Sequence, residues 1–174
     1  LRIGHTGTLD PLATGLLVLL MGRATRLARF VSGADKTYLA DICLGVTTTT
    51  FDADGEPTFQ APIPSLTLDE IVKICVEFEG CIDQSVPPYS AVKVNGKRLY
   101  QLARAGRSFR PPKRTVEIRR FRPTEYVPPV LSVEISCQKG TYVRSLAHEL
   151  GVKLGCGAHV QALRRIRVGP FSID

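Results

Sequence analysis

Residues 36–45 read KTYLADICLG, and apolar and polar side chains alternate along them. One face of this stretch carries Tyr38, Ala40, Ile42 and Leu44. Alternation of this kind predicts a β-strand with one buried face. Residues 114–127 and 131–138 alternate in the same way, the second with Leu131, Val133, Ile135 and Cys137 on one face. These stretches predict a sheet whose strands are mainly antiparallel, because strands close in sequence are readily joined by hairpins.

Helical patterns flank the predicted strands. The clearest covers residues 64–80, PSLTLDEIVKICVEFEG, where Thr67 and Glu70 have the spacing of a capping box and Gly80 follows the apolar face. Residues 141–155 predict a second helix with apolar side chains on one side. Strands and helices in this order favour an α+β fold formed by residues 1–174 as one domain.

Weaker patterns complete the prediction. Asp10 and Pro11 have the residue types of an N-cap and a first helical position, so a helix is expected over residues 12–20, and a second short one over residues 24–31. Residues 90–106 predict a strand, a turn at Asn95-Gly96 and a basic helix. Residues 47–57 are expected to be a loop, and residues 158–173 a short helical turn followed by a strand.

Composition excludes several classes of protein. The chain has 174 residues, 44% of them hydrophobic, which is ordinary for a globular protein. No apolar run approaches the roughly 18 residues of a membrane span. Five cysteines without a Cys-x-x-Cys pair argue against a disulfide framework or a zinc ribbon, and favour a reducing, cytoplasmic compartment. The first residue is Leu1 within an organised segment, so we expect residues upstream of this sequence.

Charge is distributed unevenly along the chain, whose net charge is +7. Residues 41–84 carry nine acidic side chains and one basic one, whereas residues 93–122 carry eleven basic side chains and one acidic one. A basic segment of this kind indicates a surface that binds a polyanion, and nucleic acid is the ordinary partner. A solvated face is the alternative interpretation.

Motifs for metals and cofactors are missing from the sequence. His5, His148 and His159 are far apart, and HELGV at residues 148–152 lacks the second histidine of a zinc-protease helix. The sequence contains no Gly-x-Ser-x-Gly elbow, no phosphate loop and no dinucleotide fingerprint. We therefore expect neither a metal nor a cofactor.

Three residues remain as candidates for chemistry, and each has a structural alternative. Asp10 alone fits a helix cap, and Tyr38 alone fits a half-buried sheet residue. Arg144 falls in the first turn of a predicted helix, where the helix dipole disfavours a cation, so its side chain calls for an anionic partner. Lys139 and Tyr142 lie just before it in the sequence.

Taken together, six segments resemble the TruB family of tRNA pseudouridine synthases. They are GHTGTLDPLATGLL (4–17), DKTYLADICLG (35–45), DADG (52–55), PPYSAVKVNGKRLYQLARAG (87–106), KGTYVRSLAHELG (139–151) and GCGAHVQALRR (155–165). The Cbf5/dyskerin branch, which modifies ribosomal RNA through guide RNAs, resembles the chain at GTLDP and is the alternative within the superfamily. A non-catalytic RNA-binding or RNA-chaperone module is the alternative from another class, and a protein that contacts ribosomal RNA structurally is a third.

The resemblance implies isomerisation of uridine to pseudouridine in the T loop of tRNA, at position 55. It places the essential aspartate at Asp10, its basic partner at Arg144 and the active-site tyrosine at Tyr38. His5 matches a histidine expected to fill the space that the flipped base leaves. The family's segment before the aspartate motif and its PUA-type RNA-binding domain have no counterpart in this sequence.

Physical chemistry adds a geometric expectation. An ionised aspartate can act as a nucleophile, and a nearby cation keeps it ionised when water is excluded, so Asp10 and Arg144 are expected to form an ion pair. Attack on uracil C6 and attack on ribose C1′ both remain open. Expected substrate-binding residues are His5, Lys36, Lys93, Lys139, Tyr142 and Arg164. The basic residues of positions 93–122 and 164–167, together with Lys139, are expected to engage phosphates. The expected partner is the T arm of tRNA, bound by a monomer.

Overall fold

A seven-stranded sheet forms the centre of the computed structural model, which describes residues 1–94 and 96–173. The strand order is β13-β12-β4-β11-β10-β7, with every neighbouring pair antiparallel, and β2 adds to β12 in parallel. The strands are β2 (Thr14–Gly15), β4 (Lys36–Leu44), β7 (Gly80–Ser85), β10 (Lys113–Val127), β11 (Val130–Cys137), β12 (Ala158–Val168) and β13 (Phe171–Ser172). The predicted α+β fold with a mainly antiparallel sheet is confirmed.

Alternation decides which side of the sheet is buried. Along β11, buried and half-buried residues alternate without a break, and the predicted inward face of Leu131, Val133, Ile135 and Cys137 is at most 2% exposed. The inward face of β4 is likewise confirmed for Ala40, Ile42 and Leu44. Tyr38, on the same face, is only half-buried, because it lies where the apolar core ends and a cleft begins.

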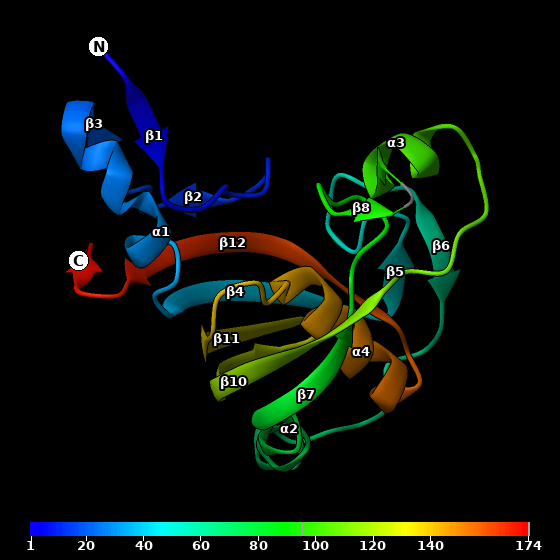
Figure 1. The fold of residues 1–174 in the computed structure, drawn as a ribbon. Coiled ribbons are helices and arrows are strands. Elements are labelled where there is room, and N and C mark those ends of the chain that lie inside the picture. Colours follow the sequence, from blue (N-terminus) through cyan, green and yellow to red (C-terminus); the bar gives the residue numbers. More distant parts are fainter. Residues whose placement is uncertain (95, 174) are drawn as a thin grey trace.

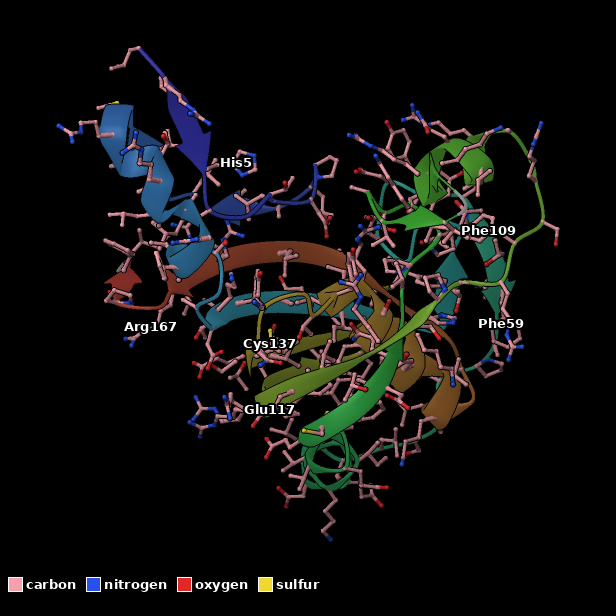
Figure 2. All side chains as sticks on the ribbon, in the orientation of Figure 1. His5, Phe59, Phe109, Glu117, Cys137 and Arg167 are labelled. Carbon is pink, nitrogen blue, oxygen red and sulfur yellow. The ribbon has the colours of Figure 1, made fainter. Side chains whose placement is uncertain are left out.

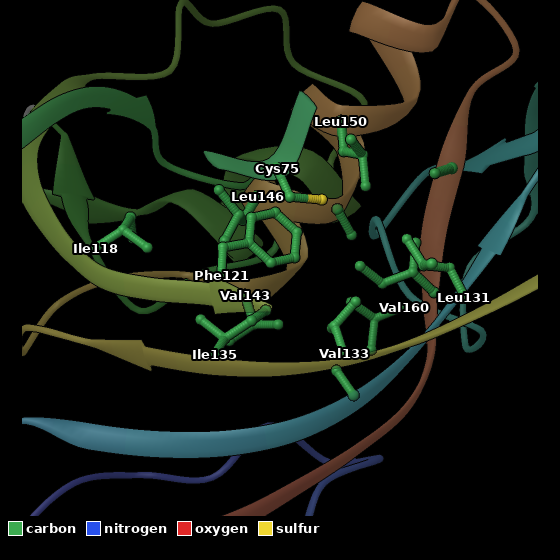
Figure 3. Packing of buried hydrophobic residues seen from close by; sticks show 14 of the residues in the cluster. Cys75, Ile118, Phe121, Leu131, Val133, Ile135, Val143, Leu146, Leu150 and Val160 are labelled. Atoms are coloured by element: carbon green, nitrogen blue, oxygen red, sulfur yellow. The ribbon is translucent and has the colours of Figure 1, made fainter. Parts of the chain in front are cut away.

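Two helices cover that face and close the core. They are α2 (Leu68–Val76), which packs on β10, and α4 (Val143–Leu154), which packs on β12 and β7. Figure 3 shows Cys75 of α2 and Leu146 and Leu150 of α4 around Phe121 of β10. The capping box at Thr67 and Glu70 is present, although α2 ends at Val76 and not at Gly80, which begins β7.

The amino-terminal segment differs from its prediction. Residues 12–20 form no helix: after a turn at Asp10 the chain runs through β2 to β3 (Leu19–Met21), which pairs with β1 (Ile3–His5). Gly15 has φ +96° and lies against the backbone of Arg165, a close approach that a helix would not allow. The apolar spacing of residues 12–20 was misleading because its leucines do not share one buried face. Asp10 is therefore not a helix cap.

The last long strand also differs from its prediction. Residues 158–165 were expected to include a helical turn, but β12 is extended throughout and pairs with β4. Irregularities in the register between Val160 and Ala162 and between Arg165 and Arg167 interrupt its alternation. Because an extra residue at a bulge shifts the inward positions, the sequence imitated a helical period.

Smaller elements surround the sheet. The predicted short helix is confirmed as η1 (Gly22–Leu27) and α1 (Ala28–Val31). The loop predicted over residues 47–57 is shorter than expected, because β5 (Val46–Thr48) and β6 (Pro57–Gln60) pair across it and take up both of its ends. The strand and basic helix predicted over residues 90–106 are present as β8 (Lys93–Val94), β9 (Lys97–Arg98) and α3 (Leu99–Arg104). Of the predicted Asn95-Gly96 turn, Asn95 lies outside the described residues.

Figure 1 shows the amino-terminal segment (β1 to α1) at the upper left, beside the end of the sheet formed by β12 and β13. The segment from β8 to α3 lies at the upper right of the same view. None of the helices in the described part of the chain is long and apolar enough to cross a bilayer.

Gly15→Ala tests the close approach of β2 to β12. A Cβ at Gly15 would lie 2.2 Å from the carbonyl oxygen of Arg165, whereas a Cβ at Gly80, with φ +91°, would meet nothing within 4 Å. Gly80→Ala should therefore lower the free energy of unfolding by the conformational penalty alone, about 1–2 kcal/mol. Gly15→Ala should lower it further, by about 1–3 kcal/mol. Urea unfolding measures both, and equal losses would contradict the described packing of β2.

Candidate active site

A cleft of about 1100 Å³ opens where the amino-terminal loop faces the start of α4. One wall is formed by residues 6–11 and the adjacent Lys36, Tyr38 and Arg165 of the sheet. The other walls come from residues 89–91, residues 138–144 and the loop that follows β5. Polar and charged groups thus converge from segments that are far apart in the sequence.

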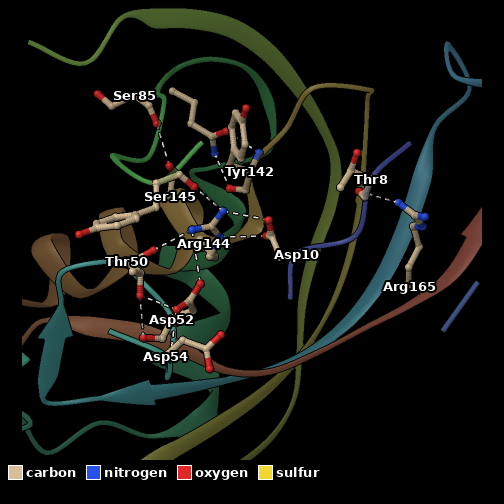
Figure 4. Close-up of polar contacts among 12 residues, drawn as sticks. Thr8, Asp10, Thr50, Asp52, Asp54, Ser85, Tyr142, Arg144, Ser145 and Arg165 are labelled. Atoms are coloured by element: carbon tan, nitrogen blue, oxygen red, sulfur yellow. Dashed lines mark hydrogen bonds and ion pairs between the residues drawn. The ribbon is translucent and has the colours of Figure 1, made fainter. Parts of the chain in front are cut away.

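The predicted contact between Asp10 and Arg144 is present in this cleft. Arg144 Nε donates to Asp10 Oδ2 and Nη2 donates to Oδ1, each at 2.9 Å, so the two groups form a bidentate ion pair (Figure 4). The Arg144 side chain is 4% exposed, whereas that of Asp10 is 28% exposed. The carboxylate is therefore held from behind by the arginine and remains accessible from the cleft.

Arg144 is also bound by the two other segments that line the cleft. Its Nη1 donates to the carbonyl oxygen of Thr50 at 2.9 Å, and its Nη2 donates to that of Tyr89 at 3.2 Å. A second carboxylate, Asp52, lies 3.4 Å from Nη1. All three guanidinium nitrogens are engaged, which leaves the side chain a single orientation.

Asp52 is a site residue that the sequence analysis did not single out. Its side chain is 4% exposed, and its Oδ1 accepts hydrogen bonds from Thr50 Oγ1 and the backbone N–H of Asp54. The available signal was DADG at residues 52–55, which contributed to the family resemblance without an assigned role. Burial makes Asp52 and Arg144 mutually dependent, because either charge alone would be costly there.

The start of α4 is anchored to β7, which positions Arg144. Gln84, fully buried, donates from Nε2 to the carbonyl oxygen of Tyr142 at 3.0 Å and accepts from the backbone N–H of Tyr142 at 2.8 Å. One turn later, Ser145 Oγ donates to the carbonyl oxygen of Ser85 at 2.7 Å. The helix dipole disfavours the positive charge of Arg144 in the first helical turn. These hydrogen bonds and the two carboxylates beside Arg144 offset that cost.

A second buried arginine holds the loop that carries Asp10. Arg165 is 2% exposed, and it donates to the carbonyl oxygens of Leu16 at 2.8 Å, Gly7 at 3.0 Å and Thr8 at 3.4 Å. The loop is thus fixed to β12 on both sides of Asp10. The prediction named Arg164, whose side chain is exposed and absent from the cleft lining, because adjacent strand residues point to opposite faces.

Lys36 and Tyr38 are two residues apart on β4, so their side chains lie on the same face, and both line the cleft. Burial raises the pKa of Tyr38 to about 12, and the guanidinium of Arg165, its cross-strand partner, acts in the opposite direction. Tyr38 is therefore a neutral phenol at physiological pH. Burial, and next the positive charge of Arg165, lower the pKa of Lys36.

The other predicted binding residues divide into two groups. Lys139 and Tyr142 line the cleft with Lys36. His5 and Lys93 are exposed and do not line it; His5 lies on β1 in the amino-terminal segment (Figure 2). Within residues 1–94 and 96–173, no cluster of side chains has the composition of a metal site.

Solved structures with this fold define a class of protein. The chain superposes on the "Crystal Structure of a Cbf5-Nop10-Gar1 Complex" with a TM-score of 0.74 and 32% identity, covering 99% of this chain and 42% of that one. It superposes on the "Structure of H/ACA RNP bound to a substrate RNA containing 2'-deoxyuridine" with a TM-score of 0.70 and 28% identity, covering 99% and 40%. The fold is that of the Cbf5/TruB-type pseudouridine synthases.

Sequence comparison narrows the class to a family. Residues 1–143 match "TruB family pseudouridylate synthase (N terminal domain)", and residues 144–174 match "tRNA pseudouridylate synthase B C-terminal domain". The chain belongs to the TruB family. Relatives named tRNA pseudouridine synthase B include proteins of Xanthomonas campestris (strain B100; 50% identity over 97% of this chain) and Nitrosococcus oceani (49% over 98%). The chain spans about half the length of these curated relatives, 54% and 55%.

Arg144→Met tests the mutual dependence of the buried charges. The substitution leaves Asp52 buried without its cation, so the free energy of unfolding should fall by about 3–5 kcal/mol. Adding Asp52→Asn should recover part of that loss, because the uncompensated charge is then removed. Urea unfolding of the single and double variants measures this coupling, and a double variant at least as unstable as the sum of its single changes would contradict it.

Proposed function

We propose that this chain isomerises uridine to pseudouridine in the T loop of tRNA, with residues 1–174 as the catalytic unit and Asp10 as the nucleophile. One observation carries the proposal: a carboxylate held by a bidentate bond to a buried arginine and still open to a cleft, in a chain of the TruB family. Such a carboxylate is ionised, fixed and accessible, as a nucleophile must be.

The reaction needs neither oxidant nor energy source, because product and substrate are isomers. In the proposed sequence, Asp10 forms a transient covalent bond to the nucleotide and the bond between N1 and C1′ breaks. The uracil rotates, a bond forms between C5 and C1′, and the bond to Asp10 breaks, which regenerates the carboxylate. The proton on C5 leaves and N1 gains a proton. Arg144 positions the Asp10 carboxylate through this sequence, since both oxygens accept from it in the resting site.

Tyr38 is the proposed partner of the flipped base. Taking the uridine out of its loop costs roughly a few kcal/mol, which stacking on an aromatic ring can offset. The phenol lines the cleft beside Arg165 and carries its proton at physiological pH, so its hydroxyl can exchange a proton with the base near C5.

RNA contacts are proposed on the basic surface around the cleft. Lys139, Arg104 and Arg114 line it. Lys93 and the remaining basic residues of positions 93–122 are proposed to bind phosphates outside the lining. His5 and Arg164, which face away from the lining, are proposed to meet the RNA outside the cleft. The partner is the T arm of tRNA, bound by a monomer in the cytoplasm, where the five free cysteines stay reduced.

Identity favours the tRNA reaction over the guide-RNA reaction. Relatives named tRNA pseudouridine synthase B are 43–50% identical to this chain, whereas the Cbf5 and H/ACA structures are 28–32% identical. A non-catalytic RNA-binding module would need the basic surface but not the pairing of Asp10 with Arg144 inside a cleft.

Asp10→Asn provides the test of catalysis. The amide keeps the shape of the side chain and removes its charge, so release of tritium from C5-labelled uridine in a T-arm hairpin should fall to background. Asp69→Asn is the control, since it removes an exposed charge from α2 and should leave release unchanged. Tritium release by Asp10→Asn at the rate of the unsubstituted protein would reject Asp10 as the nucleophile. Background release by the unsubstituted protein itself would reject the isomerisation and leave the RNA-binding alternative.

Tyr38→Phe separates stacking from proton transfer. The ring remains, so the Kd for the hairpin should change less than about threefold, while kcat should fall by about 100-fold or more. Fluorescence anisotropy measures binding, and single-turnover tritium release measures the chemical step. Equal rates for the two proteins would remove the hydroxyl from the mechanism.

A further inference from the structure

A second group of charges lies in the cleft beside the loop that carries Asp10, and it contains no carboxylate. Lys36 on β4 is 7% exposed and Arg165 on β12 is 2% exposed, and both line the cleft. Within residues 1–94 and 96–173, neither cation forms an ion pair with an acidic side chain. Because buried cations without a counter-charge are costly, this end of the cleft is suited to an anion.

The two cations approach the same point of the amino-terminal loop. A Cβ built on Gly7 would lie 3.7 Å from Arg165 Nη1 and 4.0 Å from Lys36 Cε. Gly7 itself lines the cleft and has no side chain to fill that space. Both side chains therefore lie close to the same stretch of backbone, at Gly7.

Donors remain on both cations after their bonds to the protein are counted. Lys36 Nζ donates to the carbonyl oxygens of Ser32 at 2.8 Å and Ala34 at 2.6 Å, and it carries a third hydrogen. Arg165 donates to three carbonyl oxygens, and its terminal nitrogens each carry a second hydrogen. Carbonyl oxygens hold these side chains in place without neutralising them.

Thr6 supplies an independent sign of a ligand. The residue is 2% exposed, lines the cleft and precedes Gly7. Its hydroxyl oxygen is buried and has no hydrogen-bond partner among the described residues. An unpaired buried hydroxyl costs stability, so its presence next to Gly7 in the cleft lining points to a partner that arrives with the substrate.

We propose that Thr6, Lys36 and Arg165 form a phosphate subsite, which holds a phosphodiester group adjoining the nucleotide that Asp10 attacks. The proposal rests on the proposed function, because it assigns one group of the same RNA substrate to one end of the same cleft. Thr6 and Asp10 lie on one short loop that Arg165 fixes to β12. A phosphate held at one end of this loop orients the attached nucleoside toward the carboxylate at the other.

The test removes the charge from each side of the proposed contact. T-arm hairpins carry a single neutral methylphosphonate in place of the phosphodiester on the 5′ or the 3′ side of the target uridine. With the unsubstituted protein, one of these linkages should weaken binding about tenfold or more, as loss of a charged hydrogen bond does. Lys36→Met should weaken binding of the native hairpin by a similar factor. In this variant, the methylphosphonate at that linkage should cause no further loss of affinity. Lys73→Met, an exposed lysine on α2, is the matched control and should keep the sensitivity to that linkage.

Thr6→Val separates ligand binding from structure. Valine has the shape of threonine without the unpaired hydroxyl, so the free energy of unfolding should stay the same or rise, whereas the affinity for the native hairpin should fall. A hydroxyl with a purely structural role would lower stability and leave affinity unchanged. That result would remove Thr6 from the subsite. The whole proposal would be overturned if, in addition, Lys36→Met and the methylphosphonate weakened binding independently of one another at both linkages.

The two proposals can fail separately. Dissociation constants measure the subsite without turnover, and tritium release measures the proposed function. Coupling between Lys36 and one linkage in a protein that releases no tritium would support the subsite and reject the isomerisation. Tritium release without coupling between Lys36 and either linkage would support the isomerisation and reject the subsite.

Discussion

Arg144 brings three separate segments of the chain together at one guanidinium. It binds both oxygens of Asp10, the carbonyl oxygens of Thr50 and Tyr89, and the buried carboxylate of Asp52. These groups come from the amino-terminal loop, the loop after β5 and the segment after β7, which share no other ion pair in the described part of the chain. The geometry of the cleft therefore depends on where the first turn of α4 lies.

The distribution of buried charge explains how the site can hold an ionised acid. Arg144 has two carboxylates, of which Asp52 is enclosed and Asp10 faces the cleft, so the arginine is compensated even when Asp10 is engaged by substrate. Arg165 binds the same loop through carbonyl oxygens only and keeps its positive charge uncompensated. The cleft thus has one end with the accessible carboxylate of Asp10 and one end with the cations Lys36 and Arg165, as the proposed substrate, a nucleoside attached to a phosphate, requires.

Several parts of this structure were predictable from local patterns. Alternation located β4 and β11, and the capping box located α2, because these elements bury one continuous face and follow a single period. Alternation also located β10, although two irregularities in its register interrupt the period. The position of Arg144 in a first helical turn correctly indicated an anionic partner. The prediction was wrong where the backbone departs from a single period. Gly15 has φ +96°, so the segment after Asp10 forms no helix, and the irregularities in the register of β12 produced a spacing that resembles a helical turn.

Residues that act through long-range contacts could not be found from local patterns. Asp52 and Gln84 were assigned no role from the sequence, because their contacts arise only when the sheet and α4 bring distant groups together. The basic residues of positions 164–167 were all expected to contact phosphates, but the pattern did not show that Arg165 faces the cleft and Arg164 the opposite side of the strand.

A crystal structure of the protein with a T-arm hairpin that contains pseudouridine at the target position would test the central claim most directly. We expect an extruded nucleoside stacked on Tyr38, with its C1′ or its C6 within about 3.5 Å of an Asp10 carboxylate oxygen. Both bonds from Arg144 to Asp10 should still be present. A nucleoside that stays stacked within its loop, or one bound in the cleft with Asp10 turned away from it, would contradict the account.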